Sequence, residues 1–391
     1  MTDILASDRP LRVGIDVRWH NDSGVGIYIR NLINSLLELD ERIEYVFYLN
    51  ESEEIFWGTG CKRVQARRVK IPKYSFKEQL TFPRLAAEDR LDVFHIPFYV
   101  TPLRYSGKIV VTLYDLEQLL FRHCAPRWPG QTLIHSMMKL TVIKADRIIA
   151  ISENTKRDLV DLLDVHPEKI EITLLACSPI FVSGSPKTEF NDLAGRFSIC
   201  RPFVVAYAGK QWKLKNTAAA LLGFCHAKRQ FNLPHQMVLV GRMGPDGEAF
   251  LEAEPMAQYR ESIVRTGFVR DEDLVALYSN ADAFVFPSRY EGFGFPPLEA
   301  MACGAPVIAS PCGSLREVLG DAAIYVDPDD VDQIGAAIAG VVGDPKLRER
   351  LSRLGQERAR AFSWQETAAK TAEIYWKVAE RTRVPTAEAL R

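Results

Sequence analysis

The stretch LRVGIDV at residues 11–17 decides the fold class, because it opens a strand, loop and helix unit. A short apolar run of this kind is typical of a strand buried in a parallel sheet. A polar loop containing Gly24 and Gly26 follows, and apolar residues then recur at helical spacing from Ile27 to Leu37. A strand that leads through a glycine loop into a helix is the opening unit of a doubly wound α/β fold.

The same alternation continues through the first half of the chain. Ser152 stands where it can cap a helix that runs to about Leu163. A weakly patterned stretch at 183–202 is punctuated by Gly184, Pro186 and Pro202, and we place the domain boundary there. Further buried strands are expected at residues 45–49, 92–95, 109–113 and 147–151.

A second series of strands and helices begins after the boundary. The strand 204–208 runs into Gly209 and a basic turn, and a helix is expected from about Thr217. We therefore expect the chain to contain an N-terminal domain at 1–190, a second domain at 200–365 and a C-terminal helical segment at 366–391. Further strands of the second half are expected at residues 236–241, 283–287 and 306–309.

Composition excludes several classes of protein. The 391 residues are 47% hydrophobic and 25% charged, as in an ordinary globular protein of two domains. The formal net charge of −1 provides no basic field for nucleic acid, so we expect no nucleic-acid partner. Seven cysteines without CxxC spacing argue against a zinc site or disulfide framework and favour the cytoplasm. No apolar run approaches the ~20 residues that span a bilayer.

The stretch from Ser288 to Ala309 is the most informative about chemistry. Gly292 and Gly294 precede a helix that begins with two prolines, and the next strand follows at once. Free N–H groups and the helix dipole at such a terminus suit a diphosphate. Glu291 lies before the turn and Glu299 within the helix, so the two carboxylates can hold opposite ends of one extended ligand, as a carboxylate holds a sugar diol.

This region closely resembles the E-x7-E segment of retaining GT-B glycosyltransferases of family 4, the group 1 type, which includes bacterial mannosyltransferases of polysaccharide assembly. The resemblance covers essentially the whole chain and is best from about residue 200 to 330. It implies a GT-B fold, with two Rossmann-like doubly wound domains facing each other across a cleft. Matching segments lie at 24–26, 145–159, 209, 215–216, 266–269, 274–281 and 286–288.

The resemblance also implies roles for individual residues. Lys215 is expected to stabilise the leaving diphosphate, and Glu291 to position the transferred sugar. Glu299 is expected to bind the ribose hydroxyls, and Val269 to lie near the base. Further donor contacts are expected from the glycine loops, from Lys210 and from the backbone N–H groups at the helix start: Gly24, Gly26, Gly209, Phe293, Gly294 and Phe295.

His95 stands at a strand end near the position of the family's cleft histidine, so it is a candidate catalytic residue, with a structural role as the alternative. The chain departs from the family where His-Asp is common, because it has Tyr114-Asp115 there. The departure puts the first domain's catalytic role in question. No metal site and no cofactor are expected, because basic residues and helix ends replace Mg²⁺ in the family.

The acceptor is expected to bind the first domain, as a glycan or a polyprenyl-diphosphate-linked chain. The basic run at 62–77 is a candidate for peripheral contact with the inner face of the membrane, with a solvated strand and loop as the alternative. The helix from Trp364 to about Arg381 is expected to pack back on the first domain.

The resulting hypothesis is a retaining transferase that moves a hexose, with GDP-mannose as the favoured donor, in bacterial surface polysaccharide assembly. A non-catalytic homologue that only binds nucleotide sugar or glycan is an alternative, and a GT-B sugar-nucleotide epimerase is another. A dinucleotide oxidoreductase is disfavoured, because Ile29 stands where the third glycine of GxGxxG is required.

Overall fold

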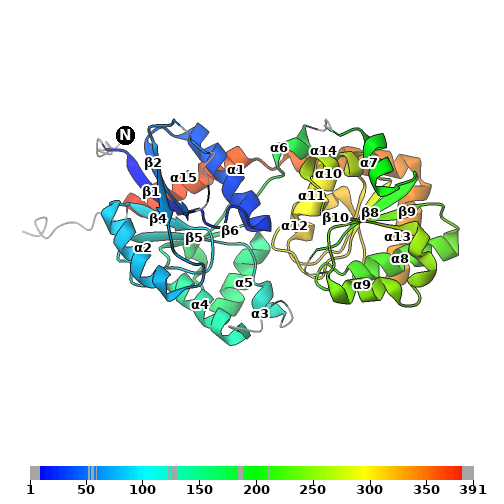
Figure 1. The fold of residues 1–391 in the computed structure, drawn as a ribbon, viewed down its shortest axis with the longest axis horizontal. Helices are drawn as coiled ribbons and strands as arrows, with labels where there is room; N and C mark the ends of the chain where they lie inside the picture. Colours follow the sequence, from blue (N-terminus) through cyan, green and yellow to red (C-terminus); the bar gives the residue numbers. More distant parts are fainter. Residues whose placement is uncertain are drawn as a thin grey trace, which may run out of the picture. The chain divides into compact units, whose positions relative to one another are not determined.

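The computed structural model describes residues 9–51, 53, 57–58, 60–121, 124, 130–183, 188–209 and 212–380. The chain divides into two compact units (Figure 1). Unit 1 comprises the chain up to Leu175 together with the segment from Trp364, and unit 2 comprises Ala176–Ser363. Each unit is an α/β domain around its own parallel sheet.

Unit 1 contains a seven-stranded parallel sheet of order β3-β2-β1-β4-β5-β6-β7. The strand order reverses between β1 and β4, so the carboxyl ends of these two strands form the crevice where α/β sheets bind ligands. The strands are β1 (Leu11–Asp16), β2 (Ile43–Asn50), β3 (Val64–Val69), β4 (Val93–Ile96), β5 (Lys108–Leu113), β6 (Arg147–Ala150) and β7 (Ile170–Ile172).

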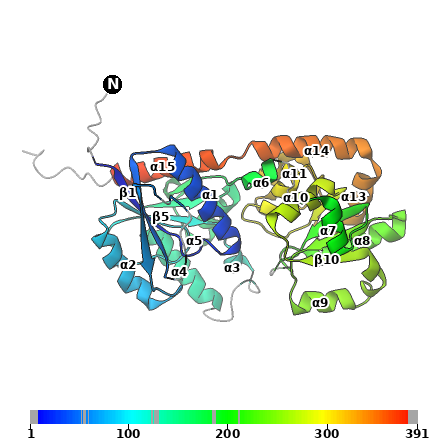
Figure 2. The same ribbon diagram turned by 45° about the horizontal axis from the view of Figure 1, so that its top comes forward.

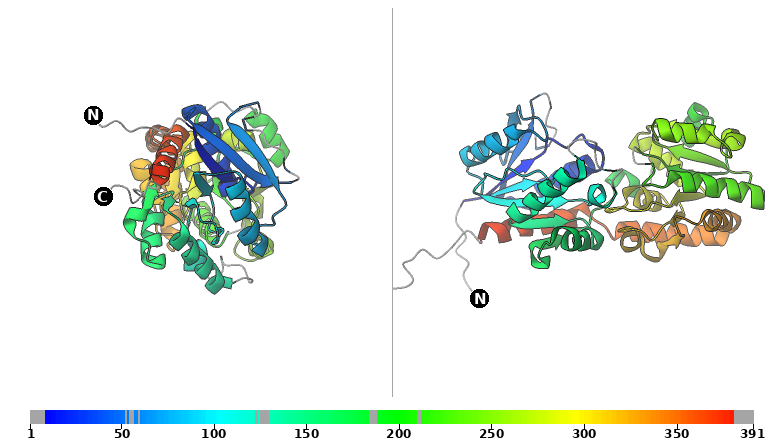
Figure 3. Two further views of the ribbon diagram at one scale, coloured as in Figure 1. Left: turned by 90° about the vertical axis from the view of Figure 1, so that its left-hand side faces the viewer. Right: turned by 90° about the horizontal axis from the view of Figure 1, so that it is seen from below.

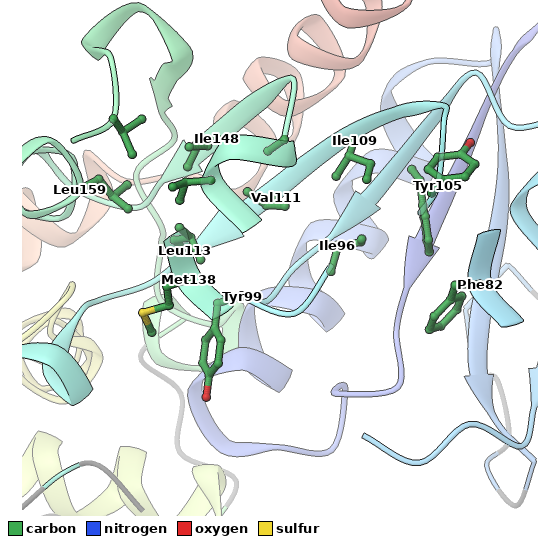
Figure 4. Packing of buried hydrophobic residues seen from close by; sticks show 14 of the residues in the cluster. Phe82, Ile96, Tyr99, Tyr105, Ile109, Val111, Leu113, Met138, Ile148 and Leu159 are labelled. Carbon is green, nitrogen blue, oxygen red and sulfur yellow. The ribbon is translucent and has the colours of Figure 1, made fainter. Parts of the chain in front are cut away.

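Helices cover both faces of this sheet (Figure 3). One face packs a large apolar cluster that includes Phe82, Tyr105 and Met138 (Figure 4). On the other face, α15 returns from the end of the chain and packs beside α1 (Figure 2). The helices of unit 1 are α1 (Ser23–Leu39), α2 (Phe76–Glu88), α3 (Glu117–Leu120), α4 (Gly130–Lys144), α5 (Glu153–Leu163), η1 (Pro167–Lys169) and α15 (Trp364–Glu380).

Helix α1 begins at Ser23, earlier than the start at Ile27 expected from the apolar spacing. The N–H of Gly26 donates to the carbonyl of Asp22 at 2.7 Å, which already closes a helical turn. A side chain at Gly26 would collide with the carbonyl of His20, so glycine permits this tight entry. The expected glycine loop is therefore the first turn of the helix.

Unit 2 contains a six-stranded parallel sheet of order β10-β9-β8-β11-β12-β13, which reverses between β8 and β11. Its strands are β8 (Phe203–Tyr207), β9 (Gln236–Val240), β10 (Ile263–Gly267), β11 (Ala283–Phe286), β12 (Val307–Ala309) and β13 (Ala323–Tyr325). Its helices are α6 (Pro179–Val182), α7 (Phe190–Phe197), α8 (Thr217–Phe231), α9 (Pro245–Glu252), η2 (Ala257–Ser262), α10 (Asp271–Asn280), α11 (Phe295–Ala302), α12 (Leu315–Leu319), η3 (Gly320–Ala322), α13 (Val331–Gly343) and α14 (Pro345–Arg360).

The helices expected from sequence are confirmed at several points. Helix α8 begins at Thr217, and Ser152 caps α5 by accepting the N–H of Thr155. The short helix before Gly304 is α11, and the expected strands correspond to β1, β2, β4, β5, β6, β8, β9, β11 and β12. Four outer strands, β3, β7, β10 and β13, were not predicted. Charged residues interrupt β3, β7 and β10, and β13 is apolar but only three residues long.

Candidate active site

The candidate site of unit 2 lies where its strand order reverses. Strand β8 ends at Tyr207 and leads towards Lys215, while β11 ends at Phe286 and leads into the loop that carries Glu291. Because β8 and β11 are neighbouring parallel strands, both loops leave the same edge of the sheet. Two elements far apart in sequence thus deliver polar side chains to the switch point, where α/β sheets bind ligands.

Lys215 and Glu291 form an ion pair at this edge. The ammonium nitrogen of Lys215 lies 2.7 Å from each carboxylate oxygen of Glu291. The Glu291 carboxylate is 7% exposed, so its negative charge is largely removed from water. The positive charge of Lys215 compensates for this loss of hydration. The structure therefore brings together two of the three residues that the sequence suggested as catalytic.

Ser288 is a third member of this cluster, and the sequence analysis assigned it no role. Its fully buried hydroxyl lies 2.7 Å from Oε1 of Glu291, and farther from the carbonyls of Leu214 and Tyr290, at 3.2 and 3.1 Å. A hydroxyl has one hydrogen, and the charged acceptor is also the nearest. Ser288 thus fixes one oxygen of Glu291 while Lys215 binds both.

The backbone around Glu291 is also held in place. The carbonyl of Glu291 accepts the N–H and the hydroxyl of Ser314, each at 3.0 Å. Gly313 has φ +60°, and a Cβ there would lie 2.5 Å from the carbonyl oxygen of Glu291. Only glycine allows the two backbones to approach so closely. Gly313 is a second residue that sequence reasoning missed, although a glycine directly after a strand and loop is a usable signal.

Helix α11 begins beside this loop with unused donors. Gly294 has φ +101° and precedes the helix, whose first turn contains Pro296 and Pro297. Within the described part of the chain, the N–H groups of Phe293, Gly294 and Phe295 donate to no protein acceptor. The ring of Phe293 is buried against Phe362, so the backbone N–H of this residue is the group available to a ligand. Such a terminus favours an anion.

Glu299 lies within α11 and is buried, with 7% of the residue exposed. Burial raises the pKa of Glu299 to about 8, and the nearby Asp271 carboxylate adds to the rise. Its side chain forms no hydrogen bond or ion pair with any residue that the structure describes. A buried carboxyl group without a partner is costly in a folded protein and is typical of functional sites.

The other donor residues expected in unit 2 are found near strand ends. Gly209 follows β8, and Val269 follows β10 with 6% of its surface exposed. Val269 directly precedes Arg270 and Asp271, and Asp271 starts α10. Lys210 lies outside the described residues.

The residues singled out in unit 1 lie at or near the carboxyl ends of β1, β4 and β5. Gly24 and Gly26 are in the first turn of α1, which follows β1. Tyr114 is largely buried, and its hydroxyl donates to the carbonyl of Pro97 at 3.2 Å. The hydroxyl is therefore engaged within the protein.

His95 is fully buried in β4, and both of its ring nitrogens are engaged. Nδ1 lies 2.6 Å from the Tyr375 hydroxyl of α15, and Nε2 lies 2.8 Å from the Thr112 hydroxyl of β5. Burial lowers the pKa of His95 to about 3, so the ring is neutral. This geometry gives the catalytic expectation no support, since the imidazole joins the sheet to α15 with no nitrogen left for a substrate.

Two parallel-sheet α/β domains, with a diphosphate-suited helix start beside a Lys–Glu pair, define the class of GT-B glycosyltransferases. A sequence profile described as glycosyl transferases group 1 matches residues 201–358, and one described as glycosyltransferase family 4 matches residues 23–173. The chain belongs to this family of glycosyltransferases.

One relative supports the family, and two solved structures support the fold. The chain is 30% identical over 283 residues to O-antigen chain mannosyltransferase B of Escherichia coli, covering 72% of this chain and 74% of that one. Sucrose-phosphate synthase of Thermosynechococcus elongatus superposes with a TM-score of 0.75 at 19% identity, covering 95% of this chain and 100% of that one. Alr3699/HepE of Anabaena, solved with UDP-glucose, superposes with a TM-score of 0.71 at 15% identity, covering 94% and 100%.

Proposed function

We propose that the protein is a retaining glycosyltransferase that moves mannose from GDP-mannose to a glycan or lipid-linked acceptor in bacterial surface polysaccharide assembly. One observation carries the proposal: the Lys215–Glu291 pair lies in the loops beside the free N–H groups at the start of α11. The mannosyl specificity is supported by the similarity to the E. coli O-antigen mannosyltransferase.

In this proposal the nucleotide diphosphate lies against α11. The N–H groups of Phe293, Gly294 and Phe295 donate to phosphate oxygens, and Lys215 supplies a full positive charge. Glu299 accepts hydrogen bonds from the ribose hydroxyls, which gives its buried carboxyl group the partners that it lacks in the free protein. Positive charge thus comes from the chain itself, and no resident cofactor is required.

The reaction breaks the bond between the anomeric carbon of the sugar and the terminal phosphate oxygen. An acceptor hydroxyl forms a new bond to the anomeric carbon on the same face, and its proton passes to the departing phosphate. Negative charge grows on that phosphate as the bond breaks, so Lys215 and the helix N-terminus stabilise the transition state more than the ground state.

Glu291 is assigned to hold the transferred sugar. Its two oxygens accept hydrogen bonds from Lys215 and Ser288, so both oxygens are already engaged. A nucleophile needs an available, electron-rich oxygen, which this arrangement does not favour. Accepting hydrogen bonds from sugar hydroxyls is compatible with both contacts.

Thermal unfolding with GDP, UDP and ADP tests the donor site, in the wild type and in Glu299→Ala. A nucleotide at 100 times its Kd stabilises the folded protein by about 2.7 kcal/mol, which is readily seen. We expect a shift with GDP that the variant loses, followed by mannose transfer from GDP-mannose. A shift with UDP or ADP alone would contradict GDP-mannose as the donor and point to a donor with that other nucleotide. No shift with any nucleotide would contradict the proposal as a whole.

A non-catalytic homologue is the second candidate, and the contacts of unit 1 favour it. His95, near the position of the family's cleft histidine, and Tyr114, where the family often has histidine, are both engaged by protein groups. Such a protein would bind nucleotide sugar as above but would neither transfer nor hydrolyse it. Product analysis after prolonged incubation with GDP-mannose and acceptor glycans separates the two candidates.

A further inference from the structure

Four aromatic side chains from three loops gather at one edge of the unit 1 sheet. Trp19 follows β1, Tyr74 follows β3, and Phe98 and Tyr99 follow β4. These strands run parallel within one sheet, so the three loops leave its carboxyl edge together, where α/β sheets bind ligands. We call this set of four residues the aromatic platform.

The rings of the platform pack directly on one another. Trp19 and Phe98 stack, with centroids 4.0 Å apart and planes inclined by 19°. Tyr74 meets Trp19 edge to face at 5.3 Å, and Phe98 stacks on Tyr99 at 4.3 Å. Trp19 and Tyr99 are buried and Phe98 is half-buried, whereas Tyr74 is 51% exposed. The most accessible ring of this packed cluster is therefore that of Tyr74.

The buried Arg18 ties together two of the segments that carry the platform. Its guanidinium donates to the carboxylate of Glu78 on α2 at 2.7 Å and to the carbonyl of Ile71 at 2.8 Å. The two charged side chains are only 2% and 4% exposed. Trp19 directly follows Arg18, and Tyr74 lies between Ile71 and α2, so both rings stand on a rigid base.

Hydrogen bonds hold the Tyr74 ring in one orientation. The Tyr99 hydroxyl donates to Oε1 of Gln118 at 3.2 Å, because that carbonyl oxygen can only accept. The Tyr74 hydroxyl therefore donates to that of Tyr99, also at 3.2 Å. Tyr74 has φ +60°, a region that glycine or asparagine adopts more readily. The backbone thus disfavours tyrosine at this position, and its ring needs another explanation.

An ion pair with no net charge lies beside the platform. The Lys73 ammonium is 4.1 Å from the centroid of the Trp19 ring and 3.0 and 3.1 Å from the two carboxylate oxygens of Asp22. The two charged side chains are 28% and 42% exposed, so they offer donors and acceptors at one place. Two other members of the basic run at 62–77, Arg63 and Arg67, are also engaged by protein groups of unit 1.

An exposed aromatic ring next to mixed donors and acceptors suits a neutral sugar. A hexose ring presents C–H groups that can pack on an aromatic face, while the hydroxyls at its rim both donate and accept hydrogen bonds. A phosphorylated ligand would call for positive charge without a compensating carboxylate. A lipid chain would leave the ion pair against apolar surface, which is unfavourable.

We propose that the aromatic platform is a glycan subsite, at which Tyr74 stacks on one neutral hexose ring and the Lys73–Asp22 pair binds hydroxyls of that ring. The strand order reverses between β1 and β4, but Tyr74 comes from β3, so the platform reaches outward from the switch point. This position suits a sugar of the acceptor chain other than the one that is extended. The inference rests on the proposed function in that the glycan is the acceptor of transfer.

Isothermal titration with mannotetraose and maltotetraose, without nucleotide, tests the subsite directly. The wild type is expected to bind at least one of them, and Tyr74→Leu to bind it about tenfold more weakly, because an aromatic anchor is lost. Tyr74→Phe keeps the ring and is expected to bind almost as well as the wild type. Phe76→Leu is the matched control, since Phe76 lies two residues away and is 92% exposed. Failure to bind either tetrasaccharide, or equal losses in Tyr74→Leu and Phe76→Leu, would overturn the assignment.

The nucleotide-induced thermal shift separates this inference from the proposed function. Tyr74→Leu is expected to keep that shift, which also shows that the variant is folded. A retained shift without tetrasaccharide binding overturns the glycan subsite alone. Tyr74-dependent tetrasaccharide binding without any nucleotide shift supports the subsite and contradicts the transferase.

Acceptor kinetics test whether the subsite lies away from the reacting sugar. Tyr74→Leu is expected to raise the KM for the tetrasaccharide about tenfold and to leave the KM for methyl mannoside and kcat nearly unchanged. An equal rise in KM for the two acceptors would place Tyr74 at the sugar that is extended and would overturn the remote subsite.

Discussion

The ammonium nitrogen of Lys215 lies equally close, at 2.7 Å, to both carboxylate oxygens of Glu291. Each group therefore neutralises the other in the ligand-free protein. A lysine presents three N–H donors, so Lys215 can turn one towards a phosphate without leaving Glu291. The two side chains are therefore already held in place, and binding of a nucleotide diphosphate requires little rearrangement of them.

Loss of the Lys215 charge should weaken both nucleotide binding and transfer. We expect Lys215→Ala to raise the Kd for the nucleoside diphosphate about tenfold or more, and to lower kcat further, because charge develops in the transition state. The variant also leaves a buried carboxylate unpaired, so its melting temperature should fall. Calorimetric titration and initial-rate kinetics measure these effects.

Lys213→Ala is the matched control for that variant. Lys213 lies two residues away, is 56% exposed and pairs with the exposed Asp246. Its pair is expected to contribute little. Equal losses of nucleotide affinity in Lys213→Ala and Lys215→Ala would show that general positive charge, rather than the Glu291 pair, supports binding.

Removal of the Ser288 hydroxyl should free one oxygen of Glu291. We expect Ser288→Ala to lower kcat about tenfold while nucleotide affinity changes little, because Ser288 contacts Glu291 rather than the proposed diphosphate site. Ser288→Thr, which keeps the hydroxyl, should restore part of the rate. In Ser314→Ala the backbone N–H still bonds the Glu291 carbonyl, so a small effect is expected. Equal losses in the two alanine variants would contradict the positioning role.

Nucleotide affinity should rise with pH through the titration of Glu299. Burial raises the pKa of Glu299 to about 8, so the free protein holds it largely protonated at pH 7. If the ribose hydroxyls donate to an ionised carboxylate, binding releases a proton, and affinity rises between pH 6 and pH 8 by at most about tenfold per unit. Glu299→Gln should bind more weakly and with a flatter pH dependence. Isothermal titration in two buffers of different ionisation enthalpy measures the proton release, and its absence would reject an ionised Glu299.

The same carboxyl group should limit stability at high pH. The folded-state pKa lies above the unfolded value, so the folded protein binds the extra proton and stability falls as pH rises between about 4.5 and 8. Glu299→Gln carries no such titration. Without nucleotide, it is expected to gain stability relative to the wild type on going from pH 5 to pH 9, as followed by chemical denaturation. A constant difference across this range would contradict the raised pKa.

His95 should affect stability at low pH. Its folded-state pKa is lowered to about 3, below the unfolded value near 6.5, so the neutral form stabilises the fold above pH 6.5 and this contribution is lost as pH falls. The slope is at most about 1.4 kcal/mol per pH unit. His95→Asn should remove the slope but lower stability at pH 7.5. Tyr375→Phe should lose about 1 kcal/mol at pH 7.5 and keep the slope, because its histidine remains.

The sequence predicted the fold well where local signals were strong. Buried parallel strands such as β5 and β8 are continuous apolar runs, and the glycines and prolines before α11 mark its start. The outer strand β3 was not predicted, because polar and charged side chains interrupt its apolar pattern and Arg67 finds its partner Asp89 on a distant segment. Local periodicity cannot show such long-range pairing.

The site was predictable in its residues but not in all of its contacts. Glu291, Glu299 and Lys215 stand out by position along the chain, yet the close approach of Gly313 to Glu291 depends on a loop 23 residues away, as measured from Glu291 to Ser314. The bond from Ser288 to Glu291 spans only three residues, but it depends on how the loop between them folds. His95 illustrates the opposite case. A histidine at a strand end suggests a ligand, but whether it faces solvent or a helix is decided by α15, which lies 280 residues away at Tyr375.

The position of α15 has a consequence for the order in which the chain can fold. Unit 2 is one continuous segment, Ala176–Ser363, whereas unit 1 is begun first but lacks α15 until all of unit 2 has been translated. Until then Tyr28, His95 and Thr112 have no helix against which to pack. The N-terminal part of the protein must therefore wait, partly assembled, until α15 has been translated after the whole of unit 2.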